Sequence, residues 1–210
     1  MRGDAFSLIE LLLVAGVLSL LLAFSAPALV PLAPTRKAGI HQLAAFLERA
    51  RLEAVATREE RWVVFADENF PDPRKALRAY ALFAPGEVPQ RLSEWRSLPE
   101  GLIFAKGRDF EVEAGFEFRT LHDLAPEQRI PAPGRDGRDG LAMPLPCLVF
   151  GGEGAIRSPG FLQADALHLG LREGFVDAAT RMVVPIPAGR GGGECLEVAL
   201  HTGRTRILTD

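Results

Sequence analysis

The N-terminal part of the chain is a long apolar run with one charge in it. Between Phe6 and Leu32 the only charged residue is Glu10. A helix of about 20 residues rises roughly 30 Å, which matches the hydrocarbon core of a bilayer. The run therefore predicts a hydrophobic transmembrane helix over residues 6–33. An acidic side chain inside such a helix is costly, so it indicates a functional position.

The residues after this run show the period of an amphipathic helix over 34–60. Its apolar positions recur at helical spacing and form one stripe, namely Ile40, Leu43, Leu47, Ala50 and Ala54. Arg49 and Glu53 stand four positions apart on the flank of the stripe, which predicts an ion pair. A helix with one apolar side needs another element to pack against, so we expect it to lie on a sheet.

From residue 61 to residue 210 the pattern predicts a β-rich domain. Short aromatic and β-branched runs alternate with turn residues, which is typical of strands. The predicted strands lie within Arg61–Asp67, Arg78–Ala84, Gly101–Ala105, Phe110–Phe118, Cys147–Phe150, Asp165–Glu173, Cys195–Leu200 and Arg204–Leu208. The segment His122–Pro146 is rich in proline, glycine and charge, and it predicts a long surface loop. The expected fold class is α+β, with a long N-terminal helix packed on an antiparallel sheet.

Composition and charge exclude several classes of protein. The formal net charge of −3 gives no basic surplus for nucleic acid, and 16 prolines with 21 glycines favour a loop-rich β body. The four histidines lie far apart, without metal-ligand spacing. The glycine-rich stretches lack the Lys-Ser/Thr ending of a phosphate loop. We therefore expect no enzyme activity, no cofactor and no metal site.

The two cysteines leave two interpretations open. Cys147 and Cys195 each begin a predicted strand, so an exported body has one pairing available. If the two strand ends are neighbours, a disulfide would close a large loop and stabilise the body by about 3–4 kcal/mol. The alternative is that both are small buried apolar residues.

The apolar run admits two general interpretations before any family is considered. A cleaved secretory signal has a basic start and an apolar core of about 7–15 residues. Here Arg2 is offset by Asp4 and the run is longer, although Ser25–Ala28 has the small residues of a cleavage site. A plain signal anchor explains the length of the run but gives Glu10 no role.

The stretch "AFSLIELLLV", Ala5–Val14, resembles the N-terminal motif of type IV prepilins and type II secretion pseudopilins. In that family a short leader ends before a phenylalanine, and a glutamate follows four residues later. The resemblance implies a leader peptide of residues 1–5, prepilin peptidase cleavage between Ala5 and Phe6, and N-methylation of Phe6. The family usually has glycine where Ala5 stands. It often has a helix-kinking proline where Pro27 stands.

The resemblance also implies a role for Glu10. Cleavage creates a positively charged amine at Phe6, inside a bundle of similar helices. A buried charge costs several kcal/mol unless it is paired. Glu10 is therefore expected to dock the Phe6 amine of a neighbouring subunit and to fix the register of assembly.

The start of the body and the chain end, "LAAFLERARLEAVATREERWVVF" and "GRTRIL", are similar to the GspH/FimT branch of minor pseudopilins. This resemblance implies a single-pass inner-membrane protein with a periplasmic C-terminal domain, assembled into a filament of the type II secretion or type IV pilus kind. The implied partners are prepilin peptidase, other pseudopilins, the inner-membrane assembly platform and membrane lipid. Such a protein serves protein transport or pilus assembly.

The C-terminal hairpin gives a second hypothesis, a DNA-binding minor pilin. A two-residue turn at Thr202–Gly203 would place Ala199 opposite Arg206, and Arg204 and Arg206 on one outward face. Two outward arginines could bind phosphates. The alternative is that Arg206 pairs diagonally with Glu197 and keeps the sheet edge soluble.

Overall fold

The computed structural model describes most of the body of the chain. Described are Val14 and residues 32–104, 128–133, 139–157, 166–185 and 194–208. The chain divides into two compact units, Met1–Pro34 and Thr35–Asp210. The predicted leader, the positions Phe6, Glu10 and Pro27, and the predicted strand Phe110–Phe118 lie outside the described residues.

The amphipathic helix is α2 (Leu32–Thr57), and its predicted stripe is buried. All five stripe residues are at most 1% exposed, and Phe46 joins them at 3%. Pro34 falls in the first turn, where a missing N–H breaks no helical hydrogen bond. The helix ends at Thr57, short of the predicted residue 60, because Arg58 takes a left-handed conformation with φ of 56°.

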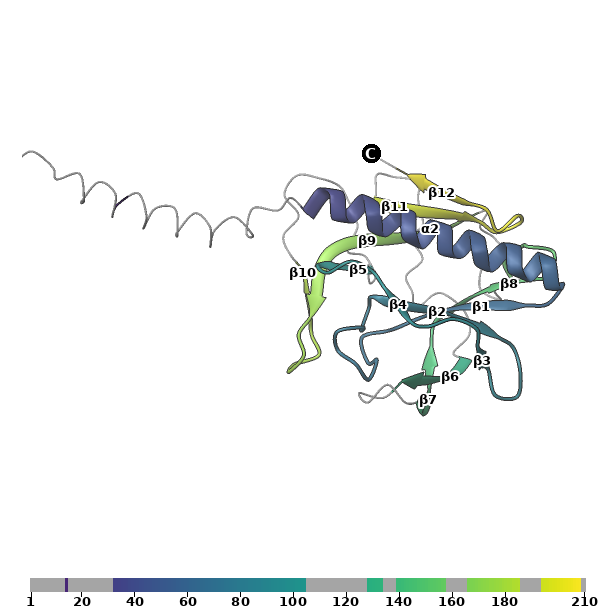
Figure 1. Cartoon of the computed structure of the whole chain (residues 1–210), viewed down its shortest axis with the longest axis horizontal. Helices are drawn as coiled ribbons and strands as arrows, with labels where there is room; N and C mark the ends of the chain where they lie inside the picture. Colours follow the sequence, from purple (N-terminus) through teal and green to yellow (C-terminus); the bar gives the residue numbers. More distant parts are fainter. Residues whose placement is uncertain are drawn as a thin grey trace, which may run out of the picture. The chain divides into compact units, whose positions relative to one another are not determined.

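In the part of the body that the structure describes, two five-stranded antiparallel sheets hold most of the strands (Figure 1). The first has the order β3-β2-β1-β8, with β4 also paired to β2. Its strands are β1 (Arg61–Phe65), β2 (Ala79–Ala84), β3 (Gln90–Arg91), β4 (Arg96–Ser97) and β8 (Cys147–Phe150). The second has the order β10-β9-β11-β12, with β5 also paired to β9. Its strands are β5 (Leu102–Phe104), β9 (Ala166–Val176), β10 (Val183–Pro185), β11 (Glu194–Ala199) and β12 (Thr205–Leu208).

The predicted loop His122–Pro146 contains a two-stranded sheet, which corrects the sequence prediction. β6 (Gln128–Pro133) and β7 (Asp139–Leu145) pair with each other, and the register shifts between Pro131 and Pro133. Proline cannot donate to a ladder, so it occurs at edges and bulges. Among the described strands β6 and β7 pair only with each other, so both are edges, and this tolerates the prolines that made the segment resemble a loop.

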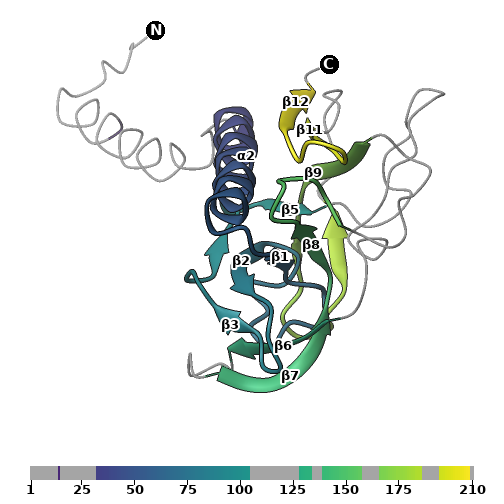
Figure 2. The same cartoon turned by 90° about the vertical axis from the view of Figure 1, so that its right-hand side faces the viewer.

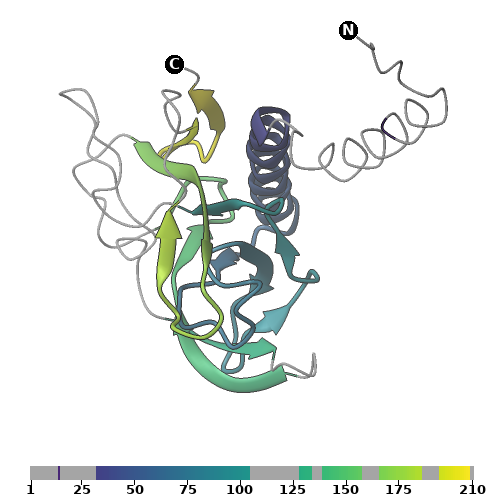
Figure 3. The same cartoon turned by 90° about the vertical axis from the view of Figure 1, so that its left-hand side faces the viewer.

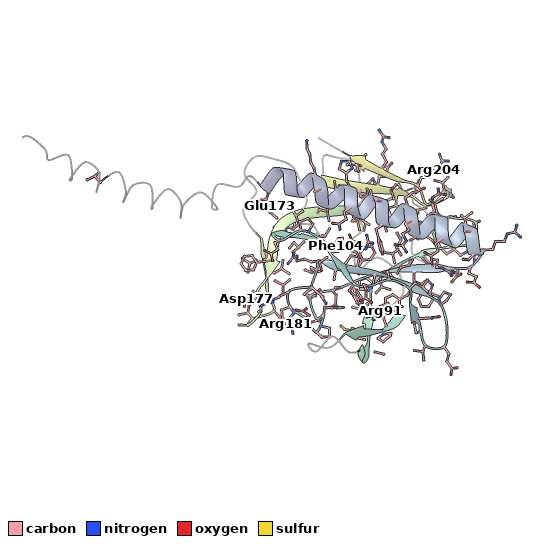
Figure 4. The ribbon with its side chains drawn as sticks, viewed as in Figure 1. Arg91, Phe104, Glu173, Asp177, Arg181 and Arg204 are labelled. Carbon is pink, nitrogen blue, oxygen red and sulfur yellow. The ribbon has the colours of Figure 1, made fainter. Side chains whose placement is uncertain are left out.

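The core lies where α2 covers the first sheet, and Figure 2 shows the helix lying over β1 and β2. On the helix side, the ring of Phe46 meets that of Tyr80 at 4.8 Å between centroids. Phe104 of β5 completes this cluster, 5.2 Å from the ring of Phe65. Its N–H donates to the carbonyl of Leu77 at 2.8 Å. Phe104 therefore joins the second sheet to the first beneath the helix (Figure 4).

The other face of β1 and β2 is also covered. Phe83 lies opposite Trp62 in the register, and its ring meets that of Trp95 at 6.0 Å. Trp95 in turn packs edge-on against Phe70 at 4.8 Å. β1 is buried at every position and β2 at every position except Ala84. The described body is thus α+β, one helix packed against antiparallel sheets, as the pattern predicted at that level.

Ion pairs fix the end of α2 to the start of β1. The guanidinium of Arg61, itself buried, lies 3.5 Å from a carboxylate oxygen of Glu53 and 3.1 Å from one of Glu59. Its Nη1 also donates to the Glu60 carbonyl at 2.8 Å. The sequence predicted Arg49 as the partner of Glu53. The chain reversal at residue 58 brings Arg61 to that carboxylate, a contact that helical spacing does not reveal.

Candidate functional site

The residues that carry the strongest sequence motif are not in the described part of the chain. Ala5, Phe6, Glu10 and Pro27 have no described geometry, and their roles stay predictions. In the described residues no helix combines the length and apolar character that crossing a bilayer needs. The geometry below therefore concerns the body.

The predicted C-terminal hairpin is present, but its predicted register is wrong. The structure pairs Arg206 with Glu197 rather than with Ala199. The N–H of Ala199 donates to the carbonyl of Arg204 at 2.9 Å, so the loop is two residues longer than predicted. His201 lies in this longer loop.

Gly203 explains the longer loop. It has a left-handed φ of 64°, which glycine adopts without the steric cost that a Cβ would bring. A Cβ at this position would collide with the backbone oxygen of Gly154 and lie 3.0 Å from Cδ of Arg51. The loop therefore packs closely against both the turn at Gly154 and the helix α2.

Arg206 stands beside an acid. It is exposed and directly opposite Glu197 on the same face of the sheet. A carboxylate oxygen of Glu197 lies 3.3 Å from Nε2 of His168, a residue of the neighbouring strand β9 that is 7% exposed. The carboxylate lies between two basic residues. The register therefore places Arg206 directly opposite Glu197, the acid of the alternative interpretation, rather than diagonal to it.

Arg204 also has an acidic neighbour. The hydrogen bond from Arg51 is the main cause that lowers the pKa of Glu48, and the charge of Arg204 lowers it further. Arg51 Nη2 is 2.6 Å from Glu48 Oε1. Arg204 and Arg206 are both exposed, as predicted, but each lies near a carboxylate. Nucleic-acid binding by this hairpin stays a prediction, which a gel shift with the full chain at low salt decides.

The two cysteines lie in different sheets. Cys147 begins β8 in the first sheet and Cys195 lies in β11 of the second. Both are buried thiols in this structure. Burial raises the pKa of the Cys147 thiol to about 12, so it is mostly protonated and slow to react at neutral pH. A disulfide between them stays a prediction that thiol labelling of native and unfolded protein tests.

The body carries one feature that the sequence reasoning missed, an apolar hairpin face. Phe175 and Val184 pair directly across β9 and β10, and Met182 follows at the turn. They are 47%, 37% and 66% exposed, respectively. The signal in the sequence was the pair of short apolar runs around Asp177–Met182, but β10 ends in a proline and was not predicted as a strand.

No group of three or more histidine, cysteine, aspartate or glutamate side chains in the described segments could hold a metal ion. Comparison with models of protein families, with curated proteins and with solved structures found no match. The sequence motif and the geometry of the body therefore carry the functional argument.

Proposed function

We propose that this chain is a minor pseudopilin or pilin-like subunit that assembles into a filament through its N-terminal helix. The single observation that carries the proposal is the stretch Ala5–Val14, in which Phe6 and Glu10 begin a long apolar run. The proposed setting is the inner membrane, crossed once, with the body in the periplasm. The partners are prepilin peptidase, sibling pseudopilins and the assembly platform of a type II secretion or type IV pilus system.

The described body supports this proposal in two ways. α2 begins at Leu32, where the apolar run ends, so the proposed membrane segment and the helix of the body are adjacent in the chain. The helix packs its buried stripe on an antiparallel sheet, which is the arrangement expected of a pilin-like body. The finer assignment to the GspH/FimT type rests on the resemblance of the sequence.

In the proposed mechanism, the carboxylate of Glu10 pairs with the amine that cleavage creates at Phe6 of a neighbouring subunit. Apolar packing of helices supplies most of the attraction. The charge pair supplies the register, because a misplaced subunit leaves two charges unpaired in apolar surroundings, at a cost of several kcal/mol.

The intact mass of protein extracted from membranes tests the proposal first. We expect loss of residues 1–5 and one added methyl group on the new N-terminus at Phe6. A full-length chain, or a new N-terminus near Ala28, would contradict it.

A substitution at Glu10 tests the docking role. Glu10→Ala makes the span more apolar, so insertion and cleavage should be normal. Crosslinking to sibling subunits should be lost, since the amine of the partner then enters the bundle without a counter-charge. Glu10→Gln should be nearly as harmful, and Glu87→Ala, an exposed glutamate of the body, is the matched control. Assembly of Glu10→Ala at the level of the control would exclude Glu10 as the docking residue.

A further inference from the structure

The apolar hairpin face points away from the body. Along the end of β9, Gly174 and Val176 are buried while Phe175 between them is exposed, so alternate residues face opposite sides. The buried side is tightly packed: a Cβ on Gly174 would lie 2.8 Å from Cδ1 of Ile103. The side chains of Phe175 and Val184 therefore stand on the face opposite the one that Ile103 covers.

The hairpin is held in place by specific contacts. Nη1 of Arg181 donates to the carbonyl of Phe70 at 2.7 Å, and its Nη2 donates to that of Pro71 at 3.3 Å. At the turn, Oδ1 of Asp177 accepts from the N–H of Thr180 at 2.7 Å and from its hydroxyl at 2.8 Å. Figure 4 shows Asp177 and Arg181 at this tip. The apolar face therefore belongs to a hairpin whose turn is held by specific hydrogen bonds.

The hairpin lies at the end of the body where α2 begins. A Cβ on Gly39 would lie 2.9 Å from Cδ1 of Leu102, and Leu102 pairs with Glu173 at the base of the hairpin. Figure 3, which views the body from this end, shows β10 and the end of β9 below the start of α2. Gly39 is only about 10 Å of helical rise from Leu32, at 1.5 Å per residue.

We propose that the apolar hairpin face rests in the interfacial layer of the lipid bilayer and orients the body on the membrane before assembly. The inference rests on the proposed function in one respect, that the run Phe6–Leu32 anchors the chain. That run ends where α2 begins, so only a few residues of chain separate the proposed anchor from the part of α2 that packs beside the base of the hairpin. Exposed apolar clusters mark interaction sites, and apolar side chains at an interface bury themselves among headgroups and upper acyl chains.

Tethering makes a small apolar face sufficient. With the anchor in the same chain, contact of the hairpin with lipid is an intramolecular event at high effective concentration. Lys37 is exposed at the start of α2, where its ammonium can meet anionic headgroups. Phe175 and Met182 would then enter the boundary between headgroups and acyl chains.

The test places tryptophan on the hairpin of the full chain. Phe175→Trp is reconstituted in phosphatidylethanolamine–phosphatidylglycerol vesicles with brominated acyl chains, which quench fluorophores that reach them. The matched control is Val88→Trp, on the loop after β2, at a position that is 75% exposed. This loop follows the end of β2 that pairs with Trp62, and Trp62 comes soon after the end of α2. The unsubstituted chain gives the background of Trp62 and Trp95.

We expect quenching of Phe175→Trp to be several-fold stronger than quenching of Val88→Trp above that background. Equal quenching of both variants in chains that resist alkaline extraction overturns the inference and leaves the proposed anchoring intact. Extraction of the chain by alkali overturns both. A blue-shifted emission that bromine does not quench and that disappears on dilution with lipid assigns the face to a second copy of the chain, which also overturns the inference.

Discussion

The β1–β2 pair and the β9–β10 hairpin are both antiparallel, but they are covered differently. β1 and β2 have α2 and Phe104 on one face and Trp95 on the other, so both faces are buried. The hairpin is packed against Ile103 on one face, and Phe175 and Val184 are exposed on the other. The comparison shows where the chain supplies its own packing partners and where it offers side chains to a partner outside the body.

The largest effect is expected from truncating one phenylalanine in each region. Phe65→Ala removes a fully buried ring that packs against Phe104, so it should lower the free energy of unfolding by about 3–5 kcal/mol. Phe175→Ala removes a half-exposed ring and should change it by less than about 0.5 kcal/mol. Denaturant titration of the full chain in detergent measures both. Similar decreases in the free energy of unfolding for the two variants would mean that both faces of the hairpin are covered.

The next effect tests the packed side of the hairpin. In Gly174→Ala the new methyl group would meet Ile103 at 2.8 Å and the carbonyl oxygen of Val184 at 3.0 Å. Overpacking of this kind costs about 1–3 kcal/mol. Val88→Ala, at a position that is 75% exposed on the loop after β2, is the control and should be near neutral. An unfolding midpoint for Gly174→Ala equal to that of the control would show that the hairpin is not seated on β5.

Arg181 should determine how firmly the hairpin tip is held. Arg181→Ala removes the donors to the carbonyls of Phe70 and Pro71, and local opening of the hairpin should become easier by about 1–2 kcal/mol. Hydrogen exchange of the Gly174 N–H, which donates to the Gly101 carbonyl at 2.9 Å, measures this opening. Arg181→Lys keeps the charge and serves as the control. Unchanged exchange in Arg181→Ala would assign the anchoring of the tip to the turn alone.

The smallest effect is a pH dependence of the hairpin turn. The N–H of Thr180 and then its hydroxyl lower the pKa of Asp177 below its usual value. A lowered pKa in the folded state means that the carboxylate stabilises the turn above pH about 4, and that this is lost as the pH falls through the lowered pKa. Exchange of the Thr180 N–H, corrected for its intrinsic rate, should accelerate in that window. In Asp177→Asn the acceleration should be absent, and its persistence there would exclude Asp177 as the cause.

The regular parts of the body were predictable because one local pattern determined them. The stripe of α2 is buried as the helical period required, and β1, β2 and β8 coincide with aromatic and β-branched runs. These elements bury side chains in the way that their own sequence period dictates. Tertiary contacts then reinforce the local preference.

The remaining parts depend on contacts between distant residues. β6 and β7 contain prolines that argue against a strand, and only their pairing as two edges permits them. The C-terminal register depends on Gly203, whose approach to Gly154 and Arg51 the local sequence does not reveal. The N-terminal motif, by contrast, is a feature of sequence alone, and Ala5, Phe6 and Glu10, which carry it, lie outside the described structure.

The wide separation of paired strands along the chain has a kinetic consequence. β1 pairs on one edge with β2, its neighbour in sequence, and on its other edge with β8, which lies far along the chain. β5 likewise pairs with β9, which is distant from it in sequence. Long-range pairings require closure of long loops before they yield contacts, and they slow folding. During synthesis the edge of β1 therefore stays open until residue 150 has emerged. During this interval a chaperone or a protease would encounter the open edge.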